Sequence, residues 1–547
     1  MRRKKIIIIV IALIVLSGGF LWFYIKYLPP KPNILLICID TLRPDYLSCY
    51  GDTKYHTPHI DQLAAQGILF ENCLTPCPIT LPAHFSIFYS LLPHQERVYN
   101  NGDVVRTSKP SLAQMLKGAE EKTQTAAIVS LGVLKRRFKL DAGFDYYNDY
   151  FNPEKGLWYR RADEITDEAL KWLKKQQSSK EPFFFFVHYS DPHEPYSPPD
   201  MLPDLQVFFN GEALKNVVLS SGEIYRFVMN LKPGLNEVKL VSLDDKGKPL
   251  NPSPDIARCY LNFLRVYPLI GIEIKYTNFY QVNVKRKKRF YLGNPAIVQL
   301  INSSDREEKI VLSFSGRTGA NIQQIKDLYG REAQFCDRHI GRLIDGIEKW
   351  GMGENLIIML ISDHGEGLGQ HKLTGHIDQL YDSLLKVPFI IYSPKLKQRG
   401  QRISQPAGLI DIAPTILNLY KIKIPEWMKG VPLLTRRLDL ITQSKDRIFF
   451  SETFTPDAIV TKFGLRTYKW KLIYTPKHQF WELYYVRRDV GETNNVFERR
   501  KEKESTVFFV NQIKEKFASH LSLKEKRKKE KLDRETLEML KSLGYIQ

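Results

Sequence analysis

The residues with the clearest chemistry stand where apolar runs of the sequence end. Asp363 and His364 follow the run 356–361, and Asp40 follows the run 34–39. A carboxylate beside an imidazole suits Zn²⁺ or Mn²⁺, whereas Ca²⁺ prefers oxygen ligands alone. We therefore expect these three side chains to bind a divalent metal ion, at a site with one or two ions. The competing interpretation is an ordinary turn at Asp363 and a helix cap at Asp40.

A threonine stands in a proline-rich loop that is suited to nucleophilic chemistry. Pro76, Pro78 and Pro82 surround Thr80, and a helical pattern begins at Ala83. Backbone amides near the start of a helix attract anions. A hydroxyl beside a metal ion has a lowered pKa and can act as a nucleophile. The alternative is that Thr80 only caps the helix.

A third apolar run, residues 183–187, leads into further polar side chains. His188, Asp191 and His193 follow it closely, and His376 lies twelve positions beyond His364. Several titratable groups at the end of one more strand favour a functional loop over a structural one.

These residues need a sheet to bring them together. The three apolar runs are short, continuous and typical of strands that are covered on both faces. Open α/β sheets bind ligands at the carboxyl ends of their strands. Helical periodicity over residues 322–350 and 410–419 predicts helices that cover the sheet. The sequence thus predicts an α/β fold with a central, mostly parallel sheet.

An insertion interrupts this pattern. Residues 203–318 contain seven short β-prone runs separated by turn signals such as Asn210-Gly211 and Pro233-Gly234. Such spacing predicts a small β-sandwich. We find no site chemistry in it, so it is either a carbohydrate- or partner-binding module or a structural insertion.

Together the motifs resemble the sulfatase-like branch of the alkaline phosphatase superfamily over residues 33–200 and 322–547. The resemblance implies an alkaline-phosphatase-like sandwich fold and an ester hydrolase activity. It rests on segments in family order: 33–40, 57–59, 80–84, 191–196, 362–367, 409–415 and 491–495.

One departure from that family changes the expected chemistry. Sulfatases carry a Cys/Ser-x-Pro-x-Arg motif whose first residue is oxidised to formylglycine, and here Thr80 and His84 occupy the first and last positions. Threonine is not a substrate for that maturation. Thr80 instead resembles the nucleophile of the phosphodiesterases and the phosphoethanolamine and phosphoglycerol transferases of the superfamily.

The resemblance also implies roles for the remaining residues. Thr80 and His193 would be catalytic, with His193 serving the leaving group or a second metal ion. The implied metal ligands are Asp40, Asp363, His364, His376 and Asp191, and the implied substrate contacts are Asn101, His84 and His188.

The amino terminus predicts a membrane anchor. Basic residues at 2–5 precede an uncharged apolar stretch at 6–25, and roughly 20 such residues span a bilayer as a helix. The charge asymmetry keeps the amino terminus cytoplasmic and the catalytic body periplasmic or extracellular. We favour an uncleaved anchor over a removed signal peptide.

The charge of the chain indicates which kind of partner it could bind. The net charge is +20, with basic clusters at 2–5 and 524–531, and we read it as attraction to an anionic membrane surface, not nucleic acid binding. The six cysteines do not reveal their pairing.

The predicted organisation has five segments: anchor and linker 1–31, catalytic parts 32–200 and 321–435, β-rich insert 201–320, and carboxyl-terminal subdomain 436–547. We expect a metal-dependent hydrolase of phosphoesters or sulfoesters on a small molecule, lipid or glycan. The alternatives are an envelope-modifying transferase, a sulfatase that works without formylglycine, and an inactive binding protein.

Overall fold

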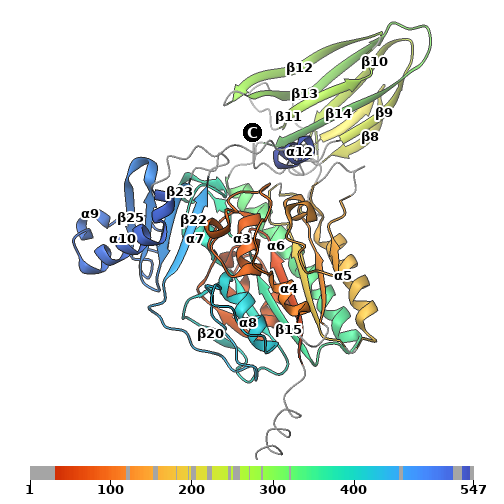
Figure 1. Cartoon of the computed structure of the whole chain (residues 1–547). Helices are drawn as coiled ribbons and strands as arrows, with labels where there is room; N and C mark the ends of the chain where they lie inside the picture. The colour runs from red at the N-terminus through yellow and green to blue at the C-terminus, as the bar shows by residue number, and fades with distance from the viewer. Residues whose placement is uncertain are drawn as a thin grey trace, which may run out of the picture.

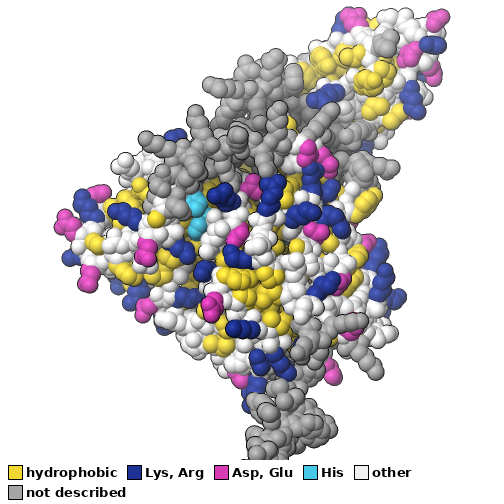
Figure 2. Space-filling model, viewed as in Figure 1, with side chains coloured by type: hydrophobic (Ala, Val, Ile, Leu, Met, Phe, Trp, Pro, Cys, Tyr) yellow, Lys and Arg dark blue, Asp and Glu magenta, His cyan; other side chains and the backbone are white. Residues whose placement is uncertain are grey.

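The computed structural model describes residues 31–118, 123–151, 158–179, 181–194, 196–198, 205–217, 225–243, 248–249, 259–269, 271–284, 287–318, 322–454, 460–521 and 533–542. Among these residues no helix has the length and apolarity needed to cross a bilayer. The predicted anchor at 6–25 lies outside the described residues. On the face in Figure 2, Lys and Arg side chains are interspersed with Asp and Glu.

A mixed eight-stranded sheet forms the centre of the molecule, in the order β20-β2-β19-β15-β1-β6-β4-β5. β19 is antiparallel to both of its neighbours, and every other pairing in this sheet is parallel. The sheet is therefore mixed, and the prediction that most of its strands are parallel is confirmed. Its strands are β1 (Asn33–Ile39), β2 (Ile68–Phe70), β4 (Gln124–Ile128), β5 (Tyr146–Asn148), β6 (Phe183–Tyr189), β15 (Leu356–Ile361), β19 (Phe389–Tyr392) and β20 (Gln401–Ile403).

Helices cover both faces of this sheet, as the continuous apolar strands require. Along β1, Leu36 and Cys38 face one apolar cluster, and Leu35 and Ile37 face the other. The first cluster is covered by α3 (Thr80–Tyr89), α4 (Leu112–Lys117) and α8 (Ile412–Leu419), which lie in front of the sheet in Figure 1. The second is covered by α2 (Pro58–Gln66), α5 (Ala162–Gln176) and α6 (Ile322–Lys349).

The register of the central strands decides where the polar residues meet. Cys38 pairs with Ile361 of β15 on one side and with His188 of β6 on the other. Because the three strands are parallel, the residues that follow them emerge at the same edge of the sheet.

The insert is a separate antiparallel unit between β6 and α6. All seven predicted runs are strands, and one strand that was not predicted, β8, joins them. Its strands are β7 (Leu205–Phe209), β8 (Glu212–Val217), β9 (Tyr225–Leu231), β10 (Gly234–Ser242), β11 (Cys259–Tyr267), β12 (Ile272–Val284), β13 (Lys287–Asn302) and β14 (Glu308–Thr318).

Strand pairing connects these eight strands, and the long strand β13 pairs with β10 through residues 296–302 and with β11 through residues 290–291. Fully buried side chains such as Val207, Leu240 and Leu312 share a core that contains no residue of the central sheet. The insert therefore buries an apolar core of its own.

The carboxyl-terminal part adds a four-stranded antiparallel sheet, and the predicted hairpin is confirmed in its last two strands. The strands are β22 (Phe449–Phe454), β23 (Val460–Arg466), β24 (Lys471–Thr475) and β25 (Phe480–Tyr484). The helices are α9 (Phe497–Arg500), α10 (Glu504–Lys516), α11 (Ala518–Leu521) and α12 (Arg534–Ser542). The remaining short elements are β3 (Cys73–Leu74), β16 (Gly367–Leu368), β17 (Thr374–Gly375), α7 (Asp382–Leu385), β18 (Lys386–Val387) and β21 (Ala407–Gly408).

Candidate active site

Asp40, Asp363 and His364 form a compact group of metal-ligand atoms at the edge of the central sheet. One atom from each lies within 4.8 Å of the others, and all three side chains are buried. His364 Nε2 is 3.4 Å from Asp363 Oδ2 and 3.9 Å from Asp40 Oδ1. The strands β1 and β15 are neighbours, which explains how residues more than 300 positions apart converge.

The backbone around this group is closely packed. A side chain at Gly365 would place its Cβ 2.1 Å from the carbonyl oxygen of Ser383. Only glycine therefore fits directly after His364. The amides of Thr41 and His364 donate to Asp363 Oδ1 at 3.2 and 2.8 Å, which leaves Oδ2 directed at the other ligand atoms.

The electrostatics of the group fit a divalent cation. Burial raises the pKa of Asp363 to about 7 and raises that of Asp40, while burial lowers the pKa of His364 to about 4. Asp363 Oδ2 and both oxygens of Asp40 have no hydrogen-bond partner among the described residues. Buried carboxylate oxygens without donors are costly, and a cation bound between them removes that cost.

Thr80 meets this group from the other side. Its Oγ1 lies 3.3 Å from His364 Nε2, and it is the first residue of α3. Asn101, predicted to contact the substrate, accepts a hydrogen bond from the Leu81 amide at 2.9 Å through Oδ1. Its buried Nδ2 has no hydrogen-bond partner among the described residues, so it remains a donor next to the nucleophile candidate.

His193 and His376 stand beside the ligand group. The His376 ring centroid is 4.5 Å from that of His364 and 5.2 Å from that of His193. Glu366 was not predicted as a site residue, and its buried carboxylate lies 3.4 Å from His376 Nδ1. Burial raises the pKa of Glu366 to about 7 and lowers the pKa of His376 to about 4.

Asp191 lies in a different set of contacts. Its Oδ1 accepts from the Ala162 amide at 3.1 Å and lies 3.7 Å from Arg161 Nη2. Arg161 also reaches Glu332 at 3.5 Å, and Glu332 accepts from the Ser197 amide at 2.8 Å. These contacts fasten both ends of the loop that carries His193. The metal-ligand role of Asp191 stays a prediction that this placement does not favour.

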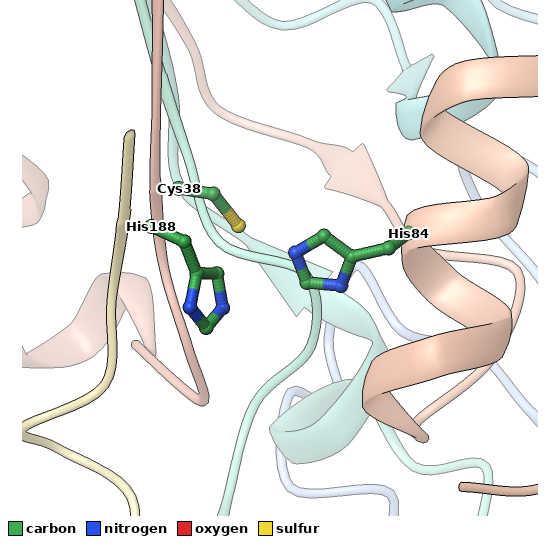
Figure 3. A group of neighbouring side chains, drawn as sticks. All are labelled: Cys38, His84 and His188. Atoms are coloured by element: carbon green, nitrogen blue, oxygen red, sulfur yellow. The ribbon is translucent and has the colours of Figure 1, made fainter. Parts of the chain in front are cut away.

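His84 and His188, predicted to contact the substrate, lie behind the ligand group. Their ring centroids are 4.9 Å apart, and Figure 3 shows both rings beside Cys38. His84 Nδ1 is 3.6 Å from Asp363 Oδ2, and His188 Nε2 is 3.4 Å from Asp40 Oδ2. Their role as substrate contacts also stays a prediction.

Comparison with known proteins agrees with this fold. The family model described as Sulfatase matches residues 32–422. The chain belongs to the sulfatase family. A second sulfatase-related model, described as N-sulphoglucosamine sulphohydrolase, C-terminal, matches residues 374–520. The family assignment makes the chain an ester hydrolase and agrees with a divalent metal at the Asp40, Asp363 and His364 group.

Curated relatives of this sulfatase-family chain span most of its length. It is 24% identical over 507 residues to the N-acetylglucosamine-6-O-sulfatase of Bacteroides thetaiotaomicron, covering 87% of this chain and 85% of the relative. It is 23% identical over 441 residues to the choline-sulfatase of Rhizobium meliloti, covering 74% of this chain and 71% of the relative.

Solved structures show the same fold. One, in complex with its substrate D-glucosamine-2-N,6-O-disulfate, has a TM-score of 0.60 at 18% identity and covers 91% of this chain and all of its own. The phosphonate monoester hydrolase of Agrobacterium radiobacter has a TM-score of 0.59 at 16% identity, and the match covers 90% of this chain and 96% of the hydrolase chain. This sulfatase-family chain therefore shares its fold with a protein whose substrate is a sulfated sugar and with a phosphonate monoester hydrolase.

Proposed function

We propose that this protein hydrolyses phosphate esters, with Thr80 as the nucleophile. The observation that carries the proposal is the distance of 3.3 Å between Thr80 Oγ1 and His364 Nε2, within the group formed with Asp40 and Asp363. A hydroxyl that reaches a buried set of ligand atoms is positioned for activation, not only for helix capping.

The ligand group would hold a divalent ion, Zn²⁺ or Mn²⁺, that lowers the pKa of the Thr80 hydroxyl and neutralises charge on the substrate. Asp40 and Asp363 compensate the charge that is buried there, and the Asp363 amide contacts keep its carboxylate in one orientation. Thr80 Oγ1 attacks phosphorus and the ester oxygen leaves. Asn101 Nδ2 donates a hydrogen bond to the transferred group, because it has no hydrogen-bond partner among the described residues.

The leaving group needs a proton donor in a buried site, because an alkoxide there would be costly. His193 is the group we assign to this role. Its Nδ1 donates to the Glu194 carbonyl at 2.5 Å, which leaves Nε2 to carry the transferable proton when the ring is protonated. His376 lies next to it, and the carboxylate of Glu366 in turn contacts His376.

Thr80 favours phosphorus over sulfur as the attacked atom. A threonine ester formed in the first step is released only by a second displacement at the central atom, and phosphorus accepts this readily under metal assistance. Sulfate esters are the second candidate substrate, because curated relatives of the chain are named as sulfatases. The N-acetylglucosamine-6-O-sulfatase relative also suggests a glycan as the carrier of the ester.

A matched substrate panel tests the proposal. The full-length protein is assayed with the 4-nitrophenyl monoester and methyl diester of phosphate and with 4-nitrophenyl sulfate, after loading with Zn²⁺ or Mn²⁺. We expect turnover of a phosphate ester that Thr80→Ala abolishes. A preference for the sulfate would overturn the choice of phosphorus. Glycerol and ethanolamine acceptors in the same assay would reveal the transferase alternative as a transfer product.

We further propose that residues 6–25 anchor the protein and that the catalytic part faces the periplasm or the exterior. The uncharged apolar stretch after the basic residues 2–5 supports this. Membrane fractions washed with alkaline carbonate should retain the full-length protein. Release of the protein by that wash would contradict anchoring.

A further inference from the structure

A second set of metal-ligand atoms lies directly behind the first. Cys38, His84 and His188 each offer one atom within 4.8 Å of the others, and all three side chains are fully buried. They come from three elements, β1, α3 and β6, as Figure 3 shows. Cys38 lies in β1 and Asp40 directly follows this strand. The two residues are two positions apart, so their side chains point to the same face of the sheet.

The hydrogen bonds of the two rings leave a coordinating nitrogen on each. His84 Nδ1 must donate to the Thr80 carbonyl, at 2.7 Å, so Nε2 of the neutral ring carries a lone pair. His188 Nδ1 pairs with Ser130 Oγ at 2.8 Å. Nε2 of each ring has no hydrogen-bond partner among the described residues. Metal-binding histidines typically engage their other ring nitrogen in this way.

Asp40 connects this set to the first one. Its Oδ1 faces His364 Nε2 at 3.9 Å, and its Oδ2 faces His188 Nε2 at 3.4 Å. Neither oxygen has a hydrogen-bond partner among the described residues. A single ion in the first group would satisfy Oδ1 but leave Oδ2 buried without a partner.

We propose that Cys38, His84 and His188 bind a second divalent ion, preferably Zn²⁺, with Asp40 bridging the two ions. One thiolate, two imidazoles and one carboxylate form a tetrahedral donor set of the kind that Zn²⁺ prefers. Zinc–ligand bond lengths place such donor atoms roughly 3.3–3.6 Å apart. The observed separations, within 4.8 Å, need only a modest contraction on binding.

The second ion would also restrain the nucleophile. His84 holds the carbonyl of Thr80, so fixing the His84 ring fixes the residue that carries the attacking hydroxyl. The competing interpretation is that Cys38 is an apolar core residue whose thiol merely contacts the two rings.

Cobalt substitution distinguishes these interpretations without any assay of activity. The full-length protein is stripped with a chelator and reloaded with Co²⁺, and its absorption and metal content are measured. We expect a near-ultraviolet cobalt–thiolate band in the wild type. Cys38→Ser should remove this band and lower the metal content by one ion per chain. Cys73→Ser is the matched control, because Cys73 is equally buried in the same apolar cluster, and it should change neither.

The wild-type spectrum is decisive even if a variant fails to fold. A reloaded wild type that binds Co²⁺ without a thiolate band would overturn the proposal. His188→Gln provides a second variant and should reduce the metal content in the same way as Cys38→Ser. An unchanged metal content in a folded Cys38→Ser or His188→Gln protein would also overturn it. If the protein proves not to hydrolyse phosphate esters, the cobalt spectrum and the metal content would still test the second metal site.

Discussion

Thr80 Oγ1 lies 3.3 Å from Nε2 of His364, although 284 positions of sequence separate the two residues. The central sheet closes this separation. Thr80 begins a helix on one face of the sheet, and His364 follows a strand that ends at the same edge. This contact makes the catalytic assignment testable residue by residue.

Removal of the Thr80 hydroxyl should abolish ester hydrolysis. We expect Thr80→Ala to lower kcat on the order of 10³-fold or more, because the nucleophile itself is lost. Thr75→Ala is a matched control, since Thr75 is also buried but its hydroxyl donates to the Cys77 carbonyl outside the ligand group. Equal losses in both variants would indicate damage to the loop and contradict the assignment.

Asp363→Asn should have opposite effects on stability with and without metal. Burial raises the pKa of Asp363 to about 7 in the ion-free protein, so a neutral amide is tolerated there at least as well. With metal present, the lost ligand should weaken binding by more than about tenfold and lower Tm below that of the wild type. Thermal unfolding in chelator and in Zn²⁺ measures both. A variant Tm that responds to Zn²⁺ as the wild type does would contradict the ligand role.

His193→Gln should affect substrates according to their leaving groups. Methyl or sugar esters need a proton donor and should lose about 10²–10⁴-fold in kcat/KM, whereas 4-nitrophenyl esters should change little. His339→Gln, on the helix α6 away from the ligand group, is the control. A uniform loss across all leaving groups would argue against proton donation.

Glu332 should make the fold less stable as pH rises. The carboxyl ionises near pH 4.5 when unfolded, and burial raises its pKa to about 8 in the folded state. Between these values the unfolded state releases a proton that the folded state keeps, so the free energy of unfolding falls with rising pH.

Glu332→Gln removes this titration and can keep the acceptor for the Ser197 amide. The stability of the variant relative to the wild type should therefore rise between about pH 5 and about pH 8, by on the order of 1 kcal/mol or more. Urea unfolding at a series of pH values measures the difference. A difference that is constant with pH would refute the raised pKa.

Asp337 on α6 should stabilise the fold by capping the amino terminus of α2. Its carboxylate on α6 accepts from the amides of His59 and Ile60 in the first turn of α2, at 3.4 and 2.8 Å. Asp337→Ala should cost about 1–2 kcal/mol, as for a lost helix cap. Asp327→Ala, which removes the exposed pair with Lys54 and a hydrogen bond from the Tyr55 hydroxyl, should cost less, about 0.5–1 kcal/mol.

The central elements could be predicted from sequence because their apolar runs are continuous. The run 356–361 coincides with β15, and the helical periodicity from Ile322 coincides with α6. β8 was missed because five of its six residues are exposed, so it lacks the alternation that marks a half-buried strand.

The site was predictable where polar residues follow strands, as at Asp40 and Asp363. Glu366 was missed because two glycines surround it and the segment reads as a turn. Cys38, whose ligand role is our proposal, was not singled out because a cysteine within an apolar strand looks like core. Asp191 gave the same signal as a metal ligand; its Oδ1 contacts Arg161 and the Ala162 amide, and its ligand role stays a prediction. Only the fold reveals which partners such residues find.

The insert lies in the chain between the loop at Ser197 and α6, and the Ser197–Glu332 hydrogen bond joins this loop to α6 about three turns into the helix. Its core is separate from that of the central sheet. Evolution can therefore alter or replace this unit as a cassette while the reaction centre keeps its geometry.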